Sequence, residues 1–393
     1  ATTINNLAFM LKEQGRYAEA EPLYRRTLSI YEKALGPDHP SVGTTLWHQA
    51  SAYARQRRWS EGLPLIRRAT RAMATRFAGR EDGDRTAVLA EQRTRSGAFE
   101  LHVSLLHGAQ GGETGAAREG LEVAQLARAS DTAEQVARMA ARYAAGSDGL
   151  GQLARTRQDG IARMQAIDTR LVQAASRAPK DRDAAAESRL RTEAEEAKRS
   201  LIALDERMEK EFPLYRELTS PQPLALADAQ NLLGAEEALV ALLVSSEESF
   251  LWVLRRDAAL FEKLAITRRE LEALVKKLRA QLDLGADEPE RILARPFDVA
   301  LAHELYRKLL APGDKLLTGV KHLIVVPDGA LSSLPLGVLV TEPAARGPSS
   351  LADHAKVAWL AKKYAITTLP SVGSLRALRA FAKGEPGRDP FLG

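Results

Sequence analysis

Cysteine is absent from all 393 residues of the sequence. Its absence excludes disulfide bonds and thiolate zinc sites, and it excludes a cysteine nucleophile on this polypeptide. Aromatic residues are scarce, at 5%. No apolar run reaches the roughly 18 residues of a membrane-spanning helix. The longest near-apolar run, residues 238–244, has the length of a strand. We therefore expect no membrane contact.

Neither sign of charge dominates, because the sequence has 56 Lys and Arg residues and 51 Asp and Glu residues, which gives a net charge of +5. A protein dedicated to nucleic acids concentrates its basic charge on one face, whereas these charges are interspersed, so we do not expect nucleic-acid binding. The composition, 45% hydrophobic and 27% charged, is typical of globular proteins. At about 150 residues per domain, the length suggests two or three domains.

The first third of the chain is repetitive. Identical residues recur 42 positions apart at Thr2, Thr3, Ala8, Gln14, Glu19, Pro22, Leu23, Arg25 and Arg26, which return at Thr44, Thr45, Ala50, Gln56, Glu61, Pro64, Leu65, Arg67 and Arg68. A fixed period of this length predicts stacked supersecondary units. Each unit shows two helical patterns, and Gly15 separates them in the first unit. The second unit departs from the first at Gln49 and Arg57.

The stretch LAFMLKEQGRYAEAEPLYRRTLSIYEKALGPDHPSV resembles the 42-residue tetratricopeptide repeats of kinesin light chains and many bacterial proteins. The resemblance covers residues 1–79, as one good repeat and one degenerate, capping repeat. It implies that the first helices of the repeats bind a protein or peptide partner on their concave face. A solvated helix face is the competing interpretation for each single residue. The candidate groove residues are Asn5, Phe9, Lys12, Trp47 and Arg55.

Residues 80–225 carry helical patterns and almost no strand signal. One apolar stripe runs from Val136 to Tyr143, and a second contains Ile161, Met164 and Leu171. A heptad seam follows at Leu190, Ala194, Ala197, Leu201, Leu204 and Met208. The segment 178–181 lies between the last two patterns and suggests a hairpin tip. We therefore expect a helical linker with an antiparallel coiled coil, ended near residue 225 by prolines.

Residues 226–393 show an α/β pattern. Strands are expected over 238–243, 250–254, 258–266, 322–326 and 365–369, with helices over 266–284, 299–310 and 371–381. The first three strands suggest a meander, and the later alternation favours a mostly parallel sheet flanked by helices. The predicted fold class is therefore α plus α/β, with N-terminal helical hairpins, a long helical middle and a C-terminal sheet.

The segment HLIVVPDGALSSLPLGVLV resembles the signature of CHAT domains, which are caspase-like domains associated with tetratricopeptide repeats. Repeats, a helical linker and then this domain form the family's architecture. Its signature turn falls on Pro327, Asp328, Gly329, Leu334 and Pro335, where a structural role is expected: Pro327 sets φ, Asp328 caps and Gly329 takes a left-handed conformation.

The CHAT resemblance implies a cysteine endopeptidase that uses a His–Cys dyad, with histidine as the base. Neither member of the dyad can be assigned here, so we name no catalytic residue. We interpret the sequence, which starts at Ala1 and stops at Gly393, as a cytoplasmic fragment that contains the non-catalytic half of an incomplete caspase-like sheet. The fragment itself is expected to be proteolytically inert.

Other chemistry is weakly supported. Ser332 and Ser333 lie near His322 and Asp328 in sequence, but the strand between His322 and Asp328 separates them by roughly 20 Å, too far for a hydrolase triad. His102 and His107 are five residues apart, a poor spacing for a metal pair on a helix. We expect no cofactor and no metal.

Two other functions stay open. The protein is an interaction scaffold if the CHAT portion is degenerate at full length. A cargo adaptor like kinesin light chain is disfavoured by the α/β third. The downstream sequence discriminates between protease and scaffold, and the oligomeric state is left open.

Overall fold

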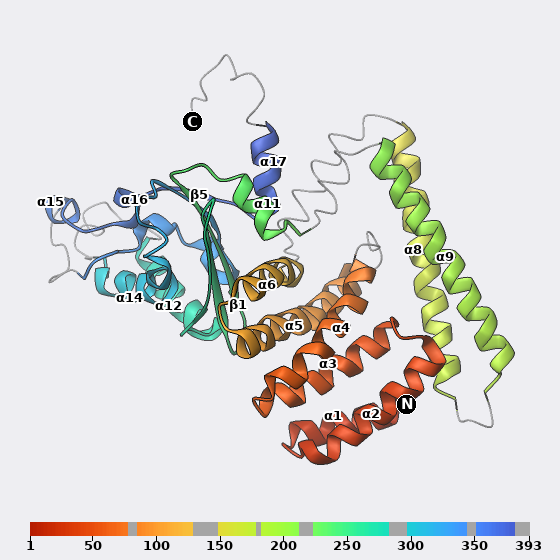
Figure 1. Cartoon of the computed structure of the whole chain (residues 1–393). Helices are drawn as coiled ribbons and strands as arrows, with labels where there is room; N and C mark the ends of the chain where they lie inside the picture. Colours follow the sequence, from red (N-terminus) through yellow and green to blue (C-terminus); the bar gives the residue numbers. More distant parts are fainter. Residues whose placement is uncertain are drawn as a thin grey trace. The chain divides into compact units, whose positions relative to one another are not determined.

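The computed structural model describes residues 1–77, 85–128, 148–177, 182–211, 223–282, 297–343 and 351–381. Contacts divide the chain into two compact units. The first contains Ala1–Ala109 with Ala129–Gln222, and the second contains Gln110–Arg128 with Pro223–Gly393 (Figure 1). The predicted fold class, α plus α/β, is confirmed.

The first unit begins with helical hairpins. Its helices are α1 (Thr2–Glu13), α2 (Tyr17–Leu35), α3 (Pro40–Arg55), α4 (Trp59–Phe77) and α5 (Arg85–Gln110). Ala8 of α1 and Ala50 of α3 occupy the same place in the two repeats, and both are fully buried. Because a methyl group is the smallest side chain with a Cβ, each of these positions lets neighbouring helix backbones approach closely.

The 42-residue period also governs the polar contacts at the helix turns. Arg16 donates to both carboxylate oxygens of Glu19 at 2.7 Å and to Gln14 at 3.3 Å. One period later, Arg58 makes the same fork to Glu61 and contacts Gln56. Bidentate pairs of this kind fix orientation as well as distance. The second repeat therefore keeps the turn of the first.

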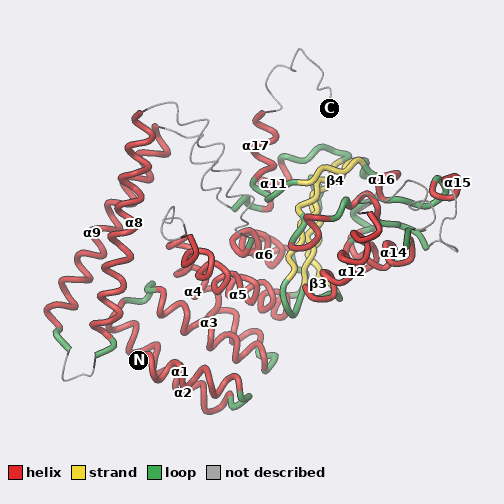
Figure 2. Tube along the Cα trace, turned by 180° about the vertical axis from the view of Figure 1, so that it is seen from behind, coloured by secondary structure: helices red, strands yellow, loops and turns green. Residues whose placement is uncertain are grey.

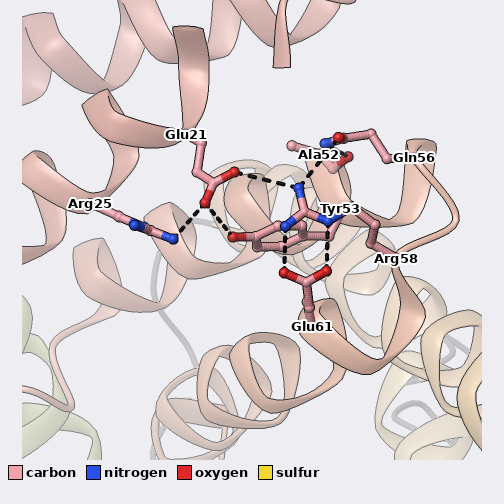
Figure 3. Close-up of polar contacts among 7 residues, drawn as sticks. All are labelled: Glu21, Arg25, Ala52, Tyr53, Gln56, Arg58 and Glu61. Carbon is pink, nitrogen blue, oxygen red and sulfur yellow. Dashed lines mark hydrogen bonds and ion pairs between the residues drawn. The ribbon is translucent and has the colours of Figure 1, made fainter. Parts of the chain in front are cut away.

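The Arg58 pair belongs to a larger network that joins three helices (Figure 3). The carboxylate of Glu21 on α2 accepts from Arg25 at 2.6 Å and from the Tyr53 hydroxyl of α3 at 2.8 Å. It also lies 3.5 Å from Arg58, which follows α3. Glu21 thus ties the second helix of the first repeat to the second repeat.

The second repeat has Arg57 where the first has Gly15, and this difference in residue type matters for the backbone conformation. Gly15 has φ 75° and Arg57 has φ 58°, so both residues take the left-handed conformation that ends the first helix of each repeat. The left-handed conformation costs a residue with a Cβ about 1–2 kcal/mol.

We expect Arg57→Gly to raise the free energy of unfolding by about 0.5–1 kcal/mol. The variant removes the left-handed strain but makes the unfolded chain more flexible, which offsets part of the gain. Urea unfolding followed by circular dichroism measures the change. As the matched control, Arg26→Gly in the exposed middle of α2 should lower stability by about 1 kcal/mol. A loss of stability in both variants contradicts the prediction.

The first unit also contains a helical hairpin made of α8 (Asp148–Ala175) and α9 (Ala184–Glu211). Gly160 lies against the Leu201 side chain, and Arg170 lies 3.9 Å from Glu193, so the two helices run antiparallel. The seam residues Leu190 and Ala197 are buried, as the heptad pattern predicted. The predicted tip at 178–181 and the apolar stripe at 136–143 lie outside the described residues.

The second unit is built on a five-stranded sheet. Its strands are β1 (Glu237–Val244), β2 (Ser249–Leu254), β3 (Ala259–Leu264), β4 (His322–Val326) and β5 (Ala365–Thr368), in the order β3-β2-β1-β4-β5. β1, β2 and β3 pair antiparallel, whereas β1 with β4 and β4 with β5 are parallel. The prediction of a mostly parallel sheet was wrong. The first three strands are joined by turns too short for a parallel crossover.

Helices lie on both faces of the sheet. They are α6 (Thr114–Ala127), α11 (Leu226–Asn231), α12 (Arg268–Leu282), α14 (Val299–Leu309), α15 (Leu351–His354), α16 (Leu360–Lys363) and α17 (Ser374–Phe381). α12 and α14 pack on one face, and α6 and α11 lie on the other (Figures 1 and 2). Residues 238–244 of β1 are buried throughout, as expected for a strand covered on both faces.

The place of α6 differs from the sequence interpretation, which put residues 80–225 into one linker. Ala116, Ala117, Leu121 and Ala124 of α6 are buried within the second unit. The Trp252 indole of β2 donates a hydrogen bond of 3.1 Å to the Ala117 carbonyl. The boundaries at residues 79 and 225 stay a prediction. Among the helices of the described ranges, none combines the length and the apolar character needed to span a bilayer.

Candidate functional site

The first candidate site is the α1–α3 surface, which we define by Asn5, Phe9 and Lys12 of α1 and Trp47, His48 and Arg55 of α3. His48 connects the two helices, because its ring lies 5.0 Å from the Phe9 ring and 5.4 Å from the Trp47 ring. The Lys12 ammonium lies 4.5 Å from the centre of the Phe9 ring. Residues from both repeats therefore meet on one surface.

This surface exposes aromatic area. Phe9 is 38% exposed, which is high for a phenylalanine. Trp47 is half-buried, and one edge of its ring packs against Gly97 of α5. An added Cβ at Gly97 would lie 3.2 Å from Trp47, so the absence of a side chain there gives the indole its place. Rigid aromatic groups with one open face are common anchors in protein interfaces.

The charges on the surface are held in defined states. Lys12 lies 2.8 Å from the Glu13 carboxylate, and this hydrogen bond lowers the pKa of Glu13, with further help from Arg55. Burial, with a smaller contribution from the nearby Lys12, lowers the pKa of His48 to about 4, while Glu13 opposes the shift. His48 is therefore neutral at pH 7, and the surface carries its positive charge on Lys12 and Arg55.

Two polar atoms on the α1–α3 surface lack partners. Asn5 Oδ1 and His48 Nδ1 are buried, and neither has a hydrogen-bond partner within the part of the chain that the structure describes. Buried polar atoms in native proteins are nearly always hydrogen-bonded. Asn5 can accept, and a neutral imidazole nitrogen can accept or donate according to its tautomer. Both atoms are enclosed by the protein itself, so neither is open to direct contact with a bound chain.

Sequence reasoning placed five members of this surface and missed His48. The 42-residue comparison aligns His48 with Asn6, so the repeat itself carries no signal for it. The dipeptide Trp47-His48 was the available signal, since two adjacent ring side chains in a chain with 5% aromatics are unusual. The assignment of the five residues to a binding groove stays a prediction.

The second candidate site is the signature turn, residues 327–335, at the carboxyl end of β4. Gly329 has φ 55°, as the left-handed interpretation predicted. Pro327 and Leu334 are buried, whereas Pro335 is exposed. Asp328 stands at the N-cap position of the 3₁₀ turn Gly329–Ser333, but its side chain makes no cap hydrogen bond. Its Oδ2 accepts instead from the Val244 amide of β1 at 2.7 Å.

The structure separates the four residues that were considered for a hydrolase triad, which are His322, Asp328, Ser332 and Ser333. His322 begins β4 and Asp328 follows its end. His322 Nδ1 lies 3.4 Å from Glu237, and its Nε2 lies 2.8 Å from the Thr367 hydroxyl. Ser333 donates to the Ala330 carbonyl at 2.7 Å within its own turn.

The histidine pair of α5 also does not form a site. His102 is buried and its Nδ1 lies 3.0 Å from the Thr70 hydroxyl of α4. Over the described ranges, the structure brings together no group of three His, Cys, Asp or Glu side chains suited to a metal ion. The expectation that no metal and no cofactor is bound stays untested.

Comparison with known families supports both recognised segments. Residues 1–41 match the tetratricopeptide repeat family, and residues 299–389 match the CHAT domain family. The chain therefore has a tetratricopeptide–CHAT arrangement. Tetratricopeptide repeats generally mediate protein–protein interactions. No curated protein matches the chain. The CHAT match begins at the first residue of α14, so it includes β4, the signature turn and β5 but not α6 or β1–β3.

Proposed function

We propose that this chain is the docking and scaffold part of a caspase-like cysteine endopeptidase, controlled by a protein partner that binds its tetratricopeptide region in the cytoplasm. The observation that carries the proposal is the occurrence of a tetratricopeptide repeat and a CHAT domain in one chain. CHAT domains resemble caspases, whose thiolate nucleophile needs a cysteine. Since this chain has none, the cysteine of the proposed enzyme's His–Cys dyad lies outside these 393 residues.

The gene downstream of the Gly393 codon provides the first test. We expect one strand followed by a histidine and the next strand followed by a cysteine. The protein expressed with that segment should then cleave a protein substrate, and Cys→Ala at the new cysteine should abolish cleavage. An absent dyad contradicts the peptidase and leaves the alternative, an interaction scaffold on a caspase-like frame.

The α1–α3 surface is the proposed docking site for a peptide segment of the partner. We expect Phe9→Ala and Trp47→Ala each to weaken peptide binding at least tenfold, because each removes an aromatic anchor from the surface. A phage-displayed library of random peptides, selected on the unaltered chain, supplies the ligand. Fluorescence anisotropy then measures its affinity for each variant.

Met10→Ala is the matched control for the docking site. Met10 follows Phe9 in α1 and is 58% exposed, but it lies outside the α1–α3 surface. Its replacement should leave peptide affinity unchanged. Equal losses in the Phe9 and Met10 variants contradict the assignment, and thermal unfolding by circular dichroism checks that each variant is folded.

A further inference from the structure

The residue that caps the C-terminus of α6 contacts the signature turn through buried charge. Arg128 is the C-terminal cap residue of this helix, and its side chain is 14% exposed. Its Nε lies 3.5 Å from Asp328 Oδ1, and its guanidinium donates to the Val326 carbonyl at 3.4 Å and to the Pro327 carbonyl. One side chain therefore holds three consecutive residues at the end of β4.

The same turn is also bonded to the neighbouring parallel strand. Asp328 accepts from the Val244 amide through one oxygen and pairs with Arg128 through the other. Burial lowers the pKa of Arg128, and the Asp328 carboxylate opposes that shift. The buried cation thus depends on Asp328, and removing either partner leaves the other charge without compensation. Arg128, Asp328 and Val244 form one continuous connection from α6 to β1.

A second residue of the last α6 turn holds the returning chain. Gln125 donates to the Leu224 carbonyl at 2.9 Å and accepts from the Leu224 amide at 2.9 Å. Leu224 is fully buried. The chain therefore leaves the second unit after Arg128 and re-enters it at Pro223, and Leu224 lies beside the same helix turn. Residues 129–222 separate the two segments of the second unit in sequence, and Gln125 joins these segments to each other.

We propose that Arg128 is a positioning residue that sets the conformation of the signature turn, and that the last turn of α6 connects the chain at Leu224 to the carboxyl ends of β1 and β4. The buried guanidinium has fixed partners, so a shift of the α6 terminus must either move the Pro327–Asp328 peptide or break its bonds. Packed elements of this kind rearrange between discrete states rather than deforming continuously.

The carboxyl ends of parallel strands are where α/β proteins assemble their ligand and catalytic sites. A connection that ends there lets a shift of the last α6 turn reach the site-forming edge of the sheet. The inference is independent of the proposed peptidase activity, because its test reads the exchange of backbone amides and needs no substrate.

Hydrogen exchange of the full chain, resolved by NMR at single amides, tests the proposal. We expect Arg128→Met to speed exchange of the Val244 amide at least tenfold, while the Val240 amide in the middle of β1 changes less than twofold. Asp328→Asn should have the same effect, which keeps the test valid if Arg128→Met does not fold. Arg118→Met, at an exposed arginine of the same helix, is the matched control and should leave both amides unchanged.

The connection to the chain at Leu224 is tested at Gln125. Gln125→Leu releases the bonds to Leu224 but leaves Arg128 intact, and we expect Val244 exchange to rise at least threefold. The double variant Gln125→Leu and Arg128→Met should exchange no faster at Val244 than Arg128→Met alone, since both changes act through one connection. Exchange at Val244 within twofold of the unaltered chain in Arg128→Met and Asp328→Asn overturns the positioning role. An unchanged Val244 in Gln125→Leu overturns the connection.

Discussion

Replacing Trp252 with alanine should lower the free energy of unfolding of the second unit by about 4 kcal/mol. Trp252 lies in β2, is fully buried and stacks on Phe261 of β3 with ring centres 4.7 Å apart. Its indole also donates to the Ala117 carbonyl of α6. The variant leaves a large cavity between the sheet and α6, and truncations of buried aromatic residues cost about 3–5 kcal/mol.

Two companion variants separate the contributions of packing and hydrogen bonding at Trp252. Trp252→Phe keeps a ring against Phe261 but removes the N–H donor, so we expect a smaller loss of about 1–2 kcal/mol. Leu7→Ala changes an exposed residue of the first unit and should leave the second unit unaffected. Urea unfolding, followed by NMR signals of β1 amides, reports on the second unit. A loss below 1 kcal/mol in Trp252→Ala contradicts the packing of α6 on this sheet.

Acidification should destabilise the first unit through His48. The pKa of this imidazole is about 4 in the folded chain and 6.5 in an unfolded one, because burial disfavours the charged form. As the pH falls, the unfolded chain therefore takes up the proton first. The stability that depends on neutral His48 is complete above pH 6.5 and is lost between pH 6.5 and 4. The loss amounts to about 3 kcal/mol at 1.36 kcal/mol per pKa unit.

His48→Gln isolates this effect, because glutamine does not titrate while other groups of the unit keep their charges. We expect the stability of the unaltered chain to fall by about 3 kcal/mol more than that of His48→Gln between pH 7 and pH 4. Urea titrations at a series of pH values, read by circular dichroism, give both curves. Parallel curves for the two proteins contradict the assigned pKa.

The elements of the fold were predicted where the local pattern is strong. The apolar run HLIVV and the turn that follows it mark β4 without reference to any other part of the chain. The heptad spacing likewise marks α9. Pairing was harder to predict: the three strands β1, β2 and β3 were expected as a meander, but the number of parallel pairs was overestimated. The short turns between these strands, rather than the composition of the strands, decide that they pair antiparallel.

Contacts between distant residues could not be predicted from one sequence. The pattern of α6 is that of an ordinary amphipathic helix, and nothing in it specifies which core it packs against. In the sequence, Arg128 is one of many interspersed arginines, and only the fold shows that it lies beside Asp328. His48 has no counterpart of its own kind in the first repeat. The partners of α6 and Arg128 come from elements far away in the chain, so a local pattern carries no information about them, and the only local signal for His48 was the adjacent Trp47.

The second unit is made from two segments that are far apart in sequence, and this affects how it folds during synthesis on the ribosome. Ala117 and Trp252 are 135 residues apart, which at about 5–20 residues per second separates their synthesis by about 7–27 s. During that interval the apolar stripe of α6 has no sheet to cover. Within the repeats and within the α8–α9 hairpin, the contacting residues are much closer in sequence. These parts therefore fold before α6 can pack on its sheet. The second unit closes last, and a nascent chain that pauses before β2 is the species most exposed to aggregation and most in need of a chaperone.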